Sequence, residues 1–491
     1  MVTNPTISLG SVSGPLTGQS AFAKLSLFAG MEFCVNSSDG FPPLDPITLR
    51  GCRFPDPSQR LSVLIAIKSR SLPEKVSLLH AQVFRLQLAQ YDEVKSNPPS
   101  SSWVSKSMDK SFFVNRRDHQ TGSFLVLTGL IWSLCISGLF AQTLQEPLPI
   151  RDLPRFDLLK MRDEQGGICA ITDQTGWAKR RSKLLESMTA IMGKLPGEDH
   201  RCDFEIQVDE EVDCGSYVRR LIRYQSEPGC HVPAYLCIPK RCLMPEAESA
   251  PAVLCLHPTD NQVGHQVVLG IAGRPNRQYA AELAERGYVT LAPSYPLLAK
   301  YQPDIRELGW ESGTLKAVWD NQRGLDLLES LPFVDARRFA AIGHSLGGHN
   351  SVYTAVFDPR IEVVVSSCGL DAYTDYYQAN PGVWMPEKGW CQLRYIPKLA
   401  DYRGRLEEIP FDFPEMVAAL APRKVLIIAP LNDGNFRADS VDRVVASARQ
   451  VYKLWDAENA LQVVHPDCDH DFPDDMRELA YRTIDSVLKS P

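Results

Sequence analysis

The chain lacks the sequence signatures of several protein classes. Its 13 cysteines form no CxxC pair and no Cys/His ladder at metal-binding spacing, so a structural zinc site is not expected. No internal repeat, low-complexity tract or basic stripe is present in the sequence. The net charge of −7 and pI near 5.9 argue against nucleic acid or an anionic membrane surface as the main partner, because an acidic protein attracts neither.

The composition is that of an ordinary globular protein, with 44% hydrophobic and 23% charged residues. A length of 491 residues is enough for one large α/β domain and additional segments. Residues 1–107 show little sustained periodicity, and within them only residues 61–67 and 75–91 look capable of regular structure. We expect residues 1–107 to be a non-native or disordered extension.

A basic stretch after Met108 is followed by an uncharged, largely apolar run over residues 124–140 and then by a small residue. This is the layout of a secretory signal peptide, which targeting machinery reads at an N-terminus. The hypothesis that follows is that the biological start is Met108. Residues 108–141 are predicted to be a signal peptide or, if uncleaved, a membrane anchor at 124–140. An exported protein is expected, whether periplasmic, secreted or membrane-anchored. A buried helix of a globular domain is the alternative.

The remainder of the chain alternates between β-rich and helical patterns. Residues 142–200 read as a linker with an amphipathic helix at 173–195, and residues 201–491 as one domain. Three β-rich runs at its start predict an antiparallel lead-in, and the later alternation predicts a mostly parallel sheet with helices on both faces. The lead-in runs are 204–212, 217–224 and 232–238; the later strands are 252–256, 289–292, 339–342, 361–367, 424–431 and 461–464; the helices are 277–286, 314–331, 346–357, 440–455 and 474–488.

One segment interrupts this alternation. Residues 369–415 are too long for an ordinary connection and rich in aromatic residues, among them Tyr373, Trp384 and Trp390. Long insertions near a catalytic centre are usually lids or substrate walls, so these three residues are predicted to line a substrate site. The alternative is an excursion that merely covers the sheet.

The most informative motif is Gly343-His344-Ser345-Leu346-Gly347, which follows an apolar strand and precedes a helical segment. Strand, strained turn and helix around Gly-x-Ser-x-Gly form a nucleophile elbow, which exposes the serine above a sheet. The glycines let the turn close, because they carry no Cβ.

A serine nucleophile needs a histidine and an acid that orients it. Asp433 follows the strand-like run at 424–431, and His470 follows the run at 461–464. Parallel strands end at one edge of a sheet, so Ser345, Asp433 and His470 are predicted to meet there. Asp371, after the run at 361–367, is the alternative acid.

With these motifs, the chain from Phe204 onward resembles the α/β-hydrolase superfamily, and within it the dienelactone hydrolase, acetyl xylan esterase and prolyl-oligopeptidase-like branch. The Asp-His-Asp-Phe turn at 469–472 stands where that branch commonly has Gly-His-x-Phe. Two residues depart from the pattern. Ser345 replaces the cysteine of dienelactone hydrolases proper, which favours ester hydrolysis, and Pro430 replaces the usual glycine before the acid.

The expected oxyanion hole uses two backbone N–H groups. Leu346 follows the nucleophile, and the loop at 257–261 supplies the second donor. Pro258 has no N–H, so Thr259 is the predicted donor. No metal or cofactor is expected. His344 and His349 lack the spacing of a metal-binding helix, and the acidic cluster at 467–475 lacks a calcium-loop glycine.

The sequence thus predicts an exported serine hydrolase that cleaves carboxylic esters through an acyl-enzyme. Its expected partner is a small-molecule or carbohydrate ester, with an acetyl xylan-type carbohydrate esterase as the more specific hypothesis. Two alternatives stay open: a prolyl-oligopeptidase-like serine peptidase, and a catalytically silent binding protein with the same fold.

Overall fold

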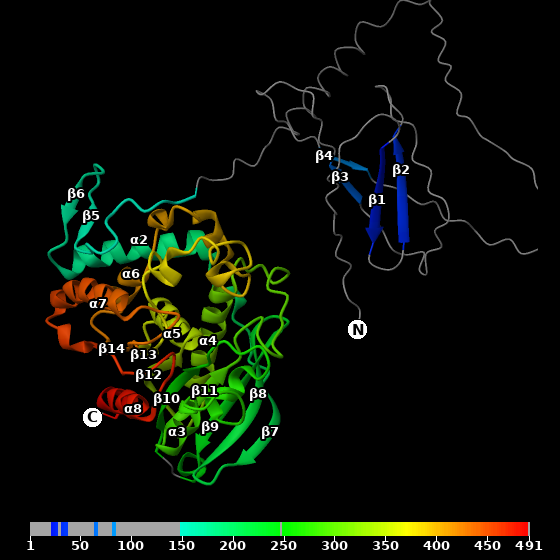
Figure 1. The fold of residues 1–491 in the computed structure, drawn as a ribbon. Coiled ribbons are helices and arrows are strands. Elements are labelled where there is room, and N and C mark those ends of the chain that lie inside the picture. The colour runs from blue at the N-terminus through cyan, green and yellow to red at the C-terminus, as the bar shows by residue number, and fades with distance from the viewer. Residues whose placement is uncertain are drawn as a thin grey trace, which may run out of the picture. The chain divides into compact units, whose positions relative to one another are not determined.

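The structure is a computed structural model that describes residues 21–27, 31–37, 63–66, 81–84, 148–245 and 248–489 (Figure 1). Contacts divide the chain into two units, Met1–Gln120 and Thr121–Pro491. The first contains two antiparallel strand pairs, β1 (Ala21–Leu27) with β2 (Met31–Ser37) and β3 (Val63–Ala66) with β4 (Ala81–Phe84). The predicted signal peptide or anchor at 124–140 lies outside the described residues. In the described part of the chain, no helix is long and apolar enough to cross a membrane.

The second unit is built on a nine-stranded sheet with the order β15-β14-β13-β12-β10-β11-β9-β8-β7. The six strands from β15 to β11 run parallel, and β9, β8 and β7 continue the sheet antiparallel. This confirms the predicted antiparallel lead-in and parallel body. The strands are β7 (Gln207–Asp213), β8 (Tyr217–Glu227), β9 (Cys230–Pro239), β10 (Ala250–Leu256), β11 (Val289–Pro293), β12 (Val334–His344), β13 (Ile361–Ser367), β14 (Lys424–Ile428) and β15 (Leu461–Val464).

Helices cover both faces of the sheet (Figure 1). On one face lie α3 (Tyr279–Glu285) and α8 (Asp474–Leu488), and on the other α4 (Gly313–Ser330), α5 (Leu346–Phe357) and α7 (Ala438–Tyr452). Strand β12 shows why: Ala340 and Ile342 are buried in the core under α3 and α8, while Phe339 and Ala341 are buried in the other core. A strand buried on both faces reads as a continuous apolar run.

Residues 148–200 pack onto the same domain. They form a short hairpin of β5 (Lys160–Arg162) and β6 (Ile168–Ala170) and the helix α2 (Gln174–Met192), close to the predicted 173–195. The carboxylate of Asp173 caps α2 by accepting a hydrogen bond from the Gly176 N–H at 2.7 Å. Trp177 and Met188 on α2 are fully buried in the core shared with α4 and α5.

The insertion consists mostly of short 3₁₀ turns, at 376–379, 389–391, 397–402 and 406–408, and ends in α6 (Phe413–Ala418). Tyr373 and Trp384 are fully buried and pack edge to face, with ring centroids 5.7 Å apart. The insertion therefore packs into the same core as α4, α5 and α7.

Candidate active site

The predicted site residues follow four adjacent parallel strands. Ser345 comes directly after β12, Asp371 after β13, Asp433 after β14 and His470 after β15. Because these strands are parallel neighbours, their C-terminal ends share one edge of the sheet, where open α/β sheets place their ligands.

Ser345 lies in a strained turn. Its φ and ψ of 55° and −121° fall in a region that non-glycine residues rarely adopt. A Cβ at Gly343 would overlap the backbone of Gly347, and one at Gly347 would overlap the carbonyl oxygen of Leu256. The elbow can therefore close only with glycine at both positions, and it brings the end of β10 against the start of α5.

His470 is oriented by Asp433. Its Nδ1 lies 2.9 Å from both carboxylate oxygens of Asp433. The Asp433 side chain is 1% exposed and also accepts hydrogen bonds from the N–H groups of Asn435 and Phe436. Buried and held by three donors, this carboxylate is suited to fix the tautomer of the imidazole.

Asp371 does not contact His470 in this way. Its carboxylate is 1% exposed and accepts one hydrogen bond, at 3.3 Å, from the backbone N–H of Arg437. Burial raises the pKa of the Asp371 carboxyl well above its usual range. The geometry therefore joins the histidine to the acid after β14.

The two predicted oxyanion donors lie on either side of the elbow. Leu346 is the first residue of α5, so its N–H has no partner within the helix. Thr259 lies three residues beyond the end of β10, and its hydroxyl is 3.1 Å from the hydroxyl of Tyr395 in the insertion. The loop that carries Thr259 thus touches both the elbow, through Leu256, and the insertion.

The serine and the histidine are not hydrogen-bonded to each other among the residues that the structure describes. The polar atom facing His470 Nε2 is instead the Asn435 Nδ2, at 3.5 Å. Hydrogen bonds of catalytic groups are often long before substrate binds.

Three residues that support the histidine loop have no sequence signal. Arg277 is buried, pairs with the Asp471 carboxylate and donates to the His470 carbonyl oxygen at 3.2 Å. The Cys368 thiol donates to the Asp471 carbonyl oxygen at 3.3 Å. Asn435 belongs to no motif. Only their proximity to the motifs in the fold identifies them.

Both ring nitrogens of His257 contact backbone groups. His257 Nδ1 lies 2.7 Å from the Pro258 carbonyl oxygen and its Nε2 accepts from the Tyr295 N–H, while burial lowers the pKa of His257 to about 4.

Within the described residues, one group could offer metal ligands, His344, Cys368 and His470, with ligand atoms within 4.8 Å of one another. Of these three residues, His470 has its Nδ1 engaged by the Asp433 carboxylate, and the Cys368 thiol donates to the Asp471 carbonyl oxygen.

Aromatic residues surround the elbow. The Trp390 ring of the insertion stacks on the His349 ring of α5, with ring centroids 4.1 Å apart. Its centroid also lies 6.3 Å from that of Phe436 and 5.1 Å from that of Tyr395. Phe436 in turn lies 6.1 Å from the His470 ring. Of the three predicted wall residues, Trp390 contacts Phe436 directly and Trp384 reaches it through Tyr376. The Tyr373 hydroxyl instead pairs with the Tyr353 hydroxyl of α5.

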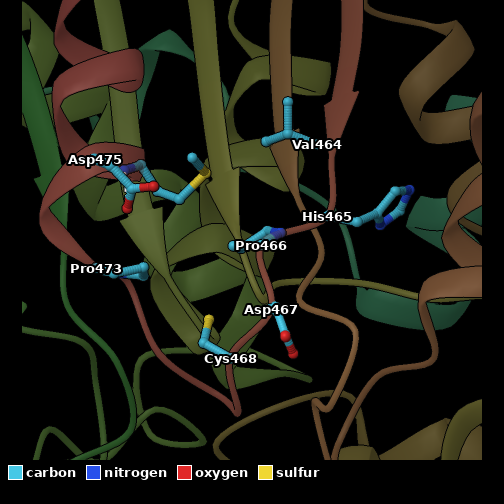
Figure 2. A pocket seen from close by; sticks show the side chains of 8 residues that line it. Val464, His465, Pro466, Asp467, Cys468, Pro473 and Asp475 are labelled. Atoms are coloured by element: carbon cyan, nitrogen blue, oxygen red, sulfur yellow. Dashed lines mark hydrogen bonds between the residues drawn. The ribbon is translucent and has the colours of Figure 1, made fainter.

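Two hollows flank the histidine loop. One, of about 560 Å³, has His470 on its wall together with Arg274, Arg277 and Asp469. The other, of about 320 Å³, lies between the end of β15 and the start of α8 (Figure 2). In Figure 2 the His465 ring points away from this second hollow, and neither Ser345 nor His470 lines it. The second hollow is therefore behind the loop and not at the catalytic edge.

Two comparisons with known sequences match parts of this chain. Residues 309–455, which include the elbow, the insertion and Asp433, match the family model described as fungal glucuronyl esterase. A Bacillus subtilis (strain 168) protein described as a hydrolase, YtaP, is 25% identical over 248 residues, covering 48% of this chain and 77% of that protein.

The solved structures that are similar define the fold. A glucuronoyl esterase from Solibacter usitatus is 18% identical and superposes with a TM-score of 0.52 over 68% of this chain and 99% of its own. A glucuronoyl esterase of carbohydrate esterase family 15 from Teredinibacter turnerae T7901 is 15% identical, with a TM-score of 0.52 over 68% of this chain and 89% of its own. The protein has the predicted α/β-hydrolase fold. The similar proteins named here are described as esterases and a hydrolase.

Proposed function

We propose that this protein is a serine hydrolase that cleaves a carbohydrate carboxylic ester through an acyl-enzyme. The observation that carries the proposal is the contact of His470 Nδ1 with both carboxylate oxygens of Asp433, at the sheet edge where the strained Ser345 opens α5. This arrangement supplies a nucleophile, a base and an acid in the order that α/β-hydrolases use.

In the proposed reaction, His470 Nε2 accepts the proton of Ser345 Oγ as that oxygen attacks the ester carbonyl. The N–H groups of Leu346 and Thr259 stabilise the oxyanion that forms. The imidazolium then gives its proton to the leaving alcohol, and water repeats the sequence to release the acid. Asp433 stays ionised and stabilises the imidazolium throughout.

The proposed substrate is a sugar ester. The family model spans the elbow, the insertion and the acid, so the likeness covers the part of the chain that would shape the acyl site. The rings of Trp390, Tyr395 and Phe436 are each 6% exposed and form a packed aromatic layer between the insertion and His470, which would support the wall of such a site. An ester of glucuronic acid is accordingly our first substrate, and acetylated xylan, predicted from the sequence, is the second.

We further propose that the hydrolase domain comprises residues 201–491 and that the protein is exported by the segment at 108–141. The apolar run at 124–140 and the basic residues before it support this. N-terminal peptide mapping of the native protein, from cells and from the surrounding medium, tests it. Peptides from before Met108 in the native protein would contradict this proposal.

A substrate panel tests the activity. Purified protein should hydrolyse benzyl glucuronate or acetylated xylan faster than a prolyl peptide, and Ser345→Ala should abolish hydrolysis of all of them. Preferential cleavage of the peptide by the wild type would favour the peptidase alternative. No turnover of any substrate would favour the silent binding protein.

A further inference from the structure

The free ring nitrogen of His470 faces an amide. Because Nδ1 is engaged by the Asp433 carboxylate, the neutral ring carries its proton on Nδ1 and a lone pair on Nε2. The nitrogen of a side-chain amide is only a donor, so Asn435 Nδ2, 3.5 Å away, can donate to that lone pair. This is the lone pair that would have to accept the Ser345 proton.

Asn435 is in turn held by the insertion. The hydroxyl of Tyr377 donates to Asn435 Oδ1 at 2.8 Å. With its oxygen bound to this hydroxyl, the amide presents its nitrogen to the imidazole. The contact joins the insertion to the loop after β14, which also carries Asp433.

The turn that presents Tyr377 is strained. Tyr377, Gln378 and Ala379 have φ values of 46°, 57° and 55°. Three consecutive non-glycine residues in the left-handed region are unfavourable and persist only where their surroundings impose them. Tyr377 is 42% exposed, so burial of its ring does not explain the strain. Packing of the turn also contributes, since Ala379 lies against the core and the Tyr377 ring meets Tyr376 at 4.7 Å. The hydrogen bond from the Tyr377 hydroxyl to Asn435 is the polar side-chain contact that this conformation provides.

A second contact between the insertion and the histidine runs through the next residue. Phe436 lies 6.1 Å from the His470 ring, and Tyr376 and Trp390 of the insertion lie against Phe436 at 5.7 and 6.3 Å. A movement of the insertion would therefore displace both Asn435 and Phe436 relative to the histidine.

We propose that Tyr377 and Asn435 form a latch that occupies His470 Nε2 in the resting protein. They are positioning residues, and the proposal rests on the proposed function of Ser345 and His470. When Tyr377 moves away, the Asn435 amide is no longer held against His470. The Nε2 atom can then accept a hydrogen bond from the Ser345 hydroxyl in place of the amide N–H. No covalent bond changes. The latch makes the reactivity of Ser345 depend on the position of the insertion.

The test is the rate at which a small fluorophosphonate modifies Ser345 in the full chain. Asn435→Ala removes the donor but keeps the backbone N–H that binds Asp433. Ser345 in this variant should be modified about fivefold faster than in the wild type, the factor that corresponds to one net hydrogen bond. In Tyr377→Phe, Ser345 should be modified about twofold faster. The double variant should match Asn435→Ala, because Tyr377 acts through Asn435.

Tyr402→Phe is the matched control, since it removes another tyrosine hydroxyl of the insertion, one that donates to the Pro149 carbonyl oxygen. Its labelling rate should equal that of the wild type. Unchanged or slower labelling of both Asn435→Ala and Tyr377→Phe, with wild-type melting temperatures, would overturn the latch. Additive effects in the double variant would overturn the link to the insertion. A wild type that forms no adduct at Ser345 would overturn the proposed function itself, which is a distinguishable result.

Discussion

At the scale of single residues, the two carboxylates that follow β13 and β14 have different surroundings. Asp433 contacts the imidazole through both oxygens, whereas Asp371 meets a backbone N–H. Replacing Asp433 with Asn should lower kcat by about 10⁴-fold, because the amide can favour the wrong tautomer of His470. Replacing Asp371 with Asn should have a much smaller effect.

Steady-state kinetics on a short acyl ester, with circular dichroism to confirm folding, measure this difference. If the Asp371 variant alone lost turnover, the acid would be the one after β13, and the assignment made from the 2.9 Å contacts would be wrong.

Gly347 is the residue on which closure of the elbow depends most. A Cβ there would overlap the Leu256 carbonyl oxygen, which belongs to the sheet and cannot move away cheaply. Gly347→Ala should lower the free energy of unfolding by about 3 kcal/mol, the upper end of the usual cost of overpacking. Gly434→Ala is the control, since a Cβ at Gly434 meets nothing within 4 Å. Thermal unfolding compares them, and equal melting temperatures would contradict the steric account.

At the scale of elements, one carboxylate fastens the insertion at both ends. Asp412 accepts a hydrogen bond from the Tyr373 N–H at 3.1 Å, caps α6 through the Phe413 N–H at 2.7 Å, and pairs with Arg155. Burial raises the pKa of Asp412, an effect that Arg155 opposes. The start of the insertion, its end and the segment before α2 therefore meet at one buried group.

Asp412→Ala should cost about 3–5 kcal/mol of unfolding free energy, because it removes the buried partner of the Arg155 guanidinium and leaves it only the exposed Glu407 carboxylate at 3.5 Å. Hydrogen exchange should speed up across residues 371–412. Asp439→Ala, which breaks only exposed pairs with Arg437 and Arg443, should cost less than about 1 kcal/mol. Denaturant titrations measure the free energy of unfolding of the two variants. Similar losses in both would mean that the buried Asp412 stabilises the fold no more than an exposed carboxylate does.

The elements that could be predicted are those whose pattern is set by burial. Residues 346–357 and 361–367 were predicted with the bounds that α5 and β13 have, because both are almost wholly buried and apolar. Strand β12 is longer than predicted, because its first half, Val-Asp-Ala-Arg-Arg, is mostly polar and mostly only partly buried. The hairpin of β5 and β6 was not predicted, since strands of three residues are too short to show a period.

The residues of the site also separate into those that could be predicted from the sequence and those that could not. Ser345, Asp433 and His470 could be placed together from the sequence because each follows a strand of one parallel sheet. Asn435 and Arg277 could not, because their contacts with His470 depend on the loop conformations that the fold imposes between distant segments. The strained turn at Tyr377 likewise follows from packing of the insertion and has no glycine to signal it.

At the scale of the whole molecule, buried neutral histidines tie stability to pH. Burial lowers the pKa of His257 to about 4 and those of His265 and His349 to about 3. In the unfolded chain these groups take up protons near pH 6.5, so the unfolded state binds more protons below that pH. The stability that these buried neutral histidines contribute should be fully present above pH 6.5 and should be lost as the pH falls toward 4.

Calorimetric unfolding between pH 8 and 4.5 measures this loss. His349→Phe keeps an aromatic ring against Trp390 but removes one titrating group. It should make the fall shallower by about 1.4 kcal/mol per pH unit. A slope unchanged from the wild type would mean that His349 does not contribute.

The central claim is that Ser345 is a nucleophile activated by His470 and Asp433. Its most direct test is treatment of the full chain with a fluorophosphonate probe, followed by peptide mass analysis. We predict one adduct, on Ser345, that is absent from Ser345→Ala and strongly slowed in folded His470→Ala. An unmodified Ser345 in the folded wild type, or an adduct that forms equally fast without His470, would contradict the account.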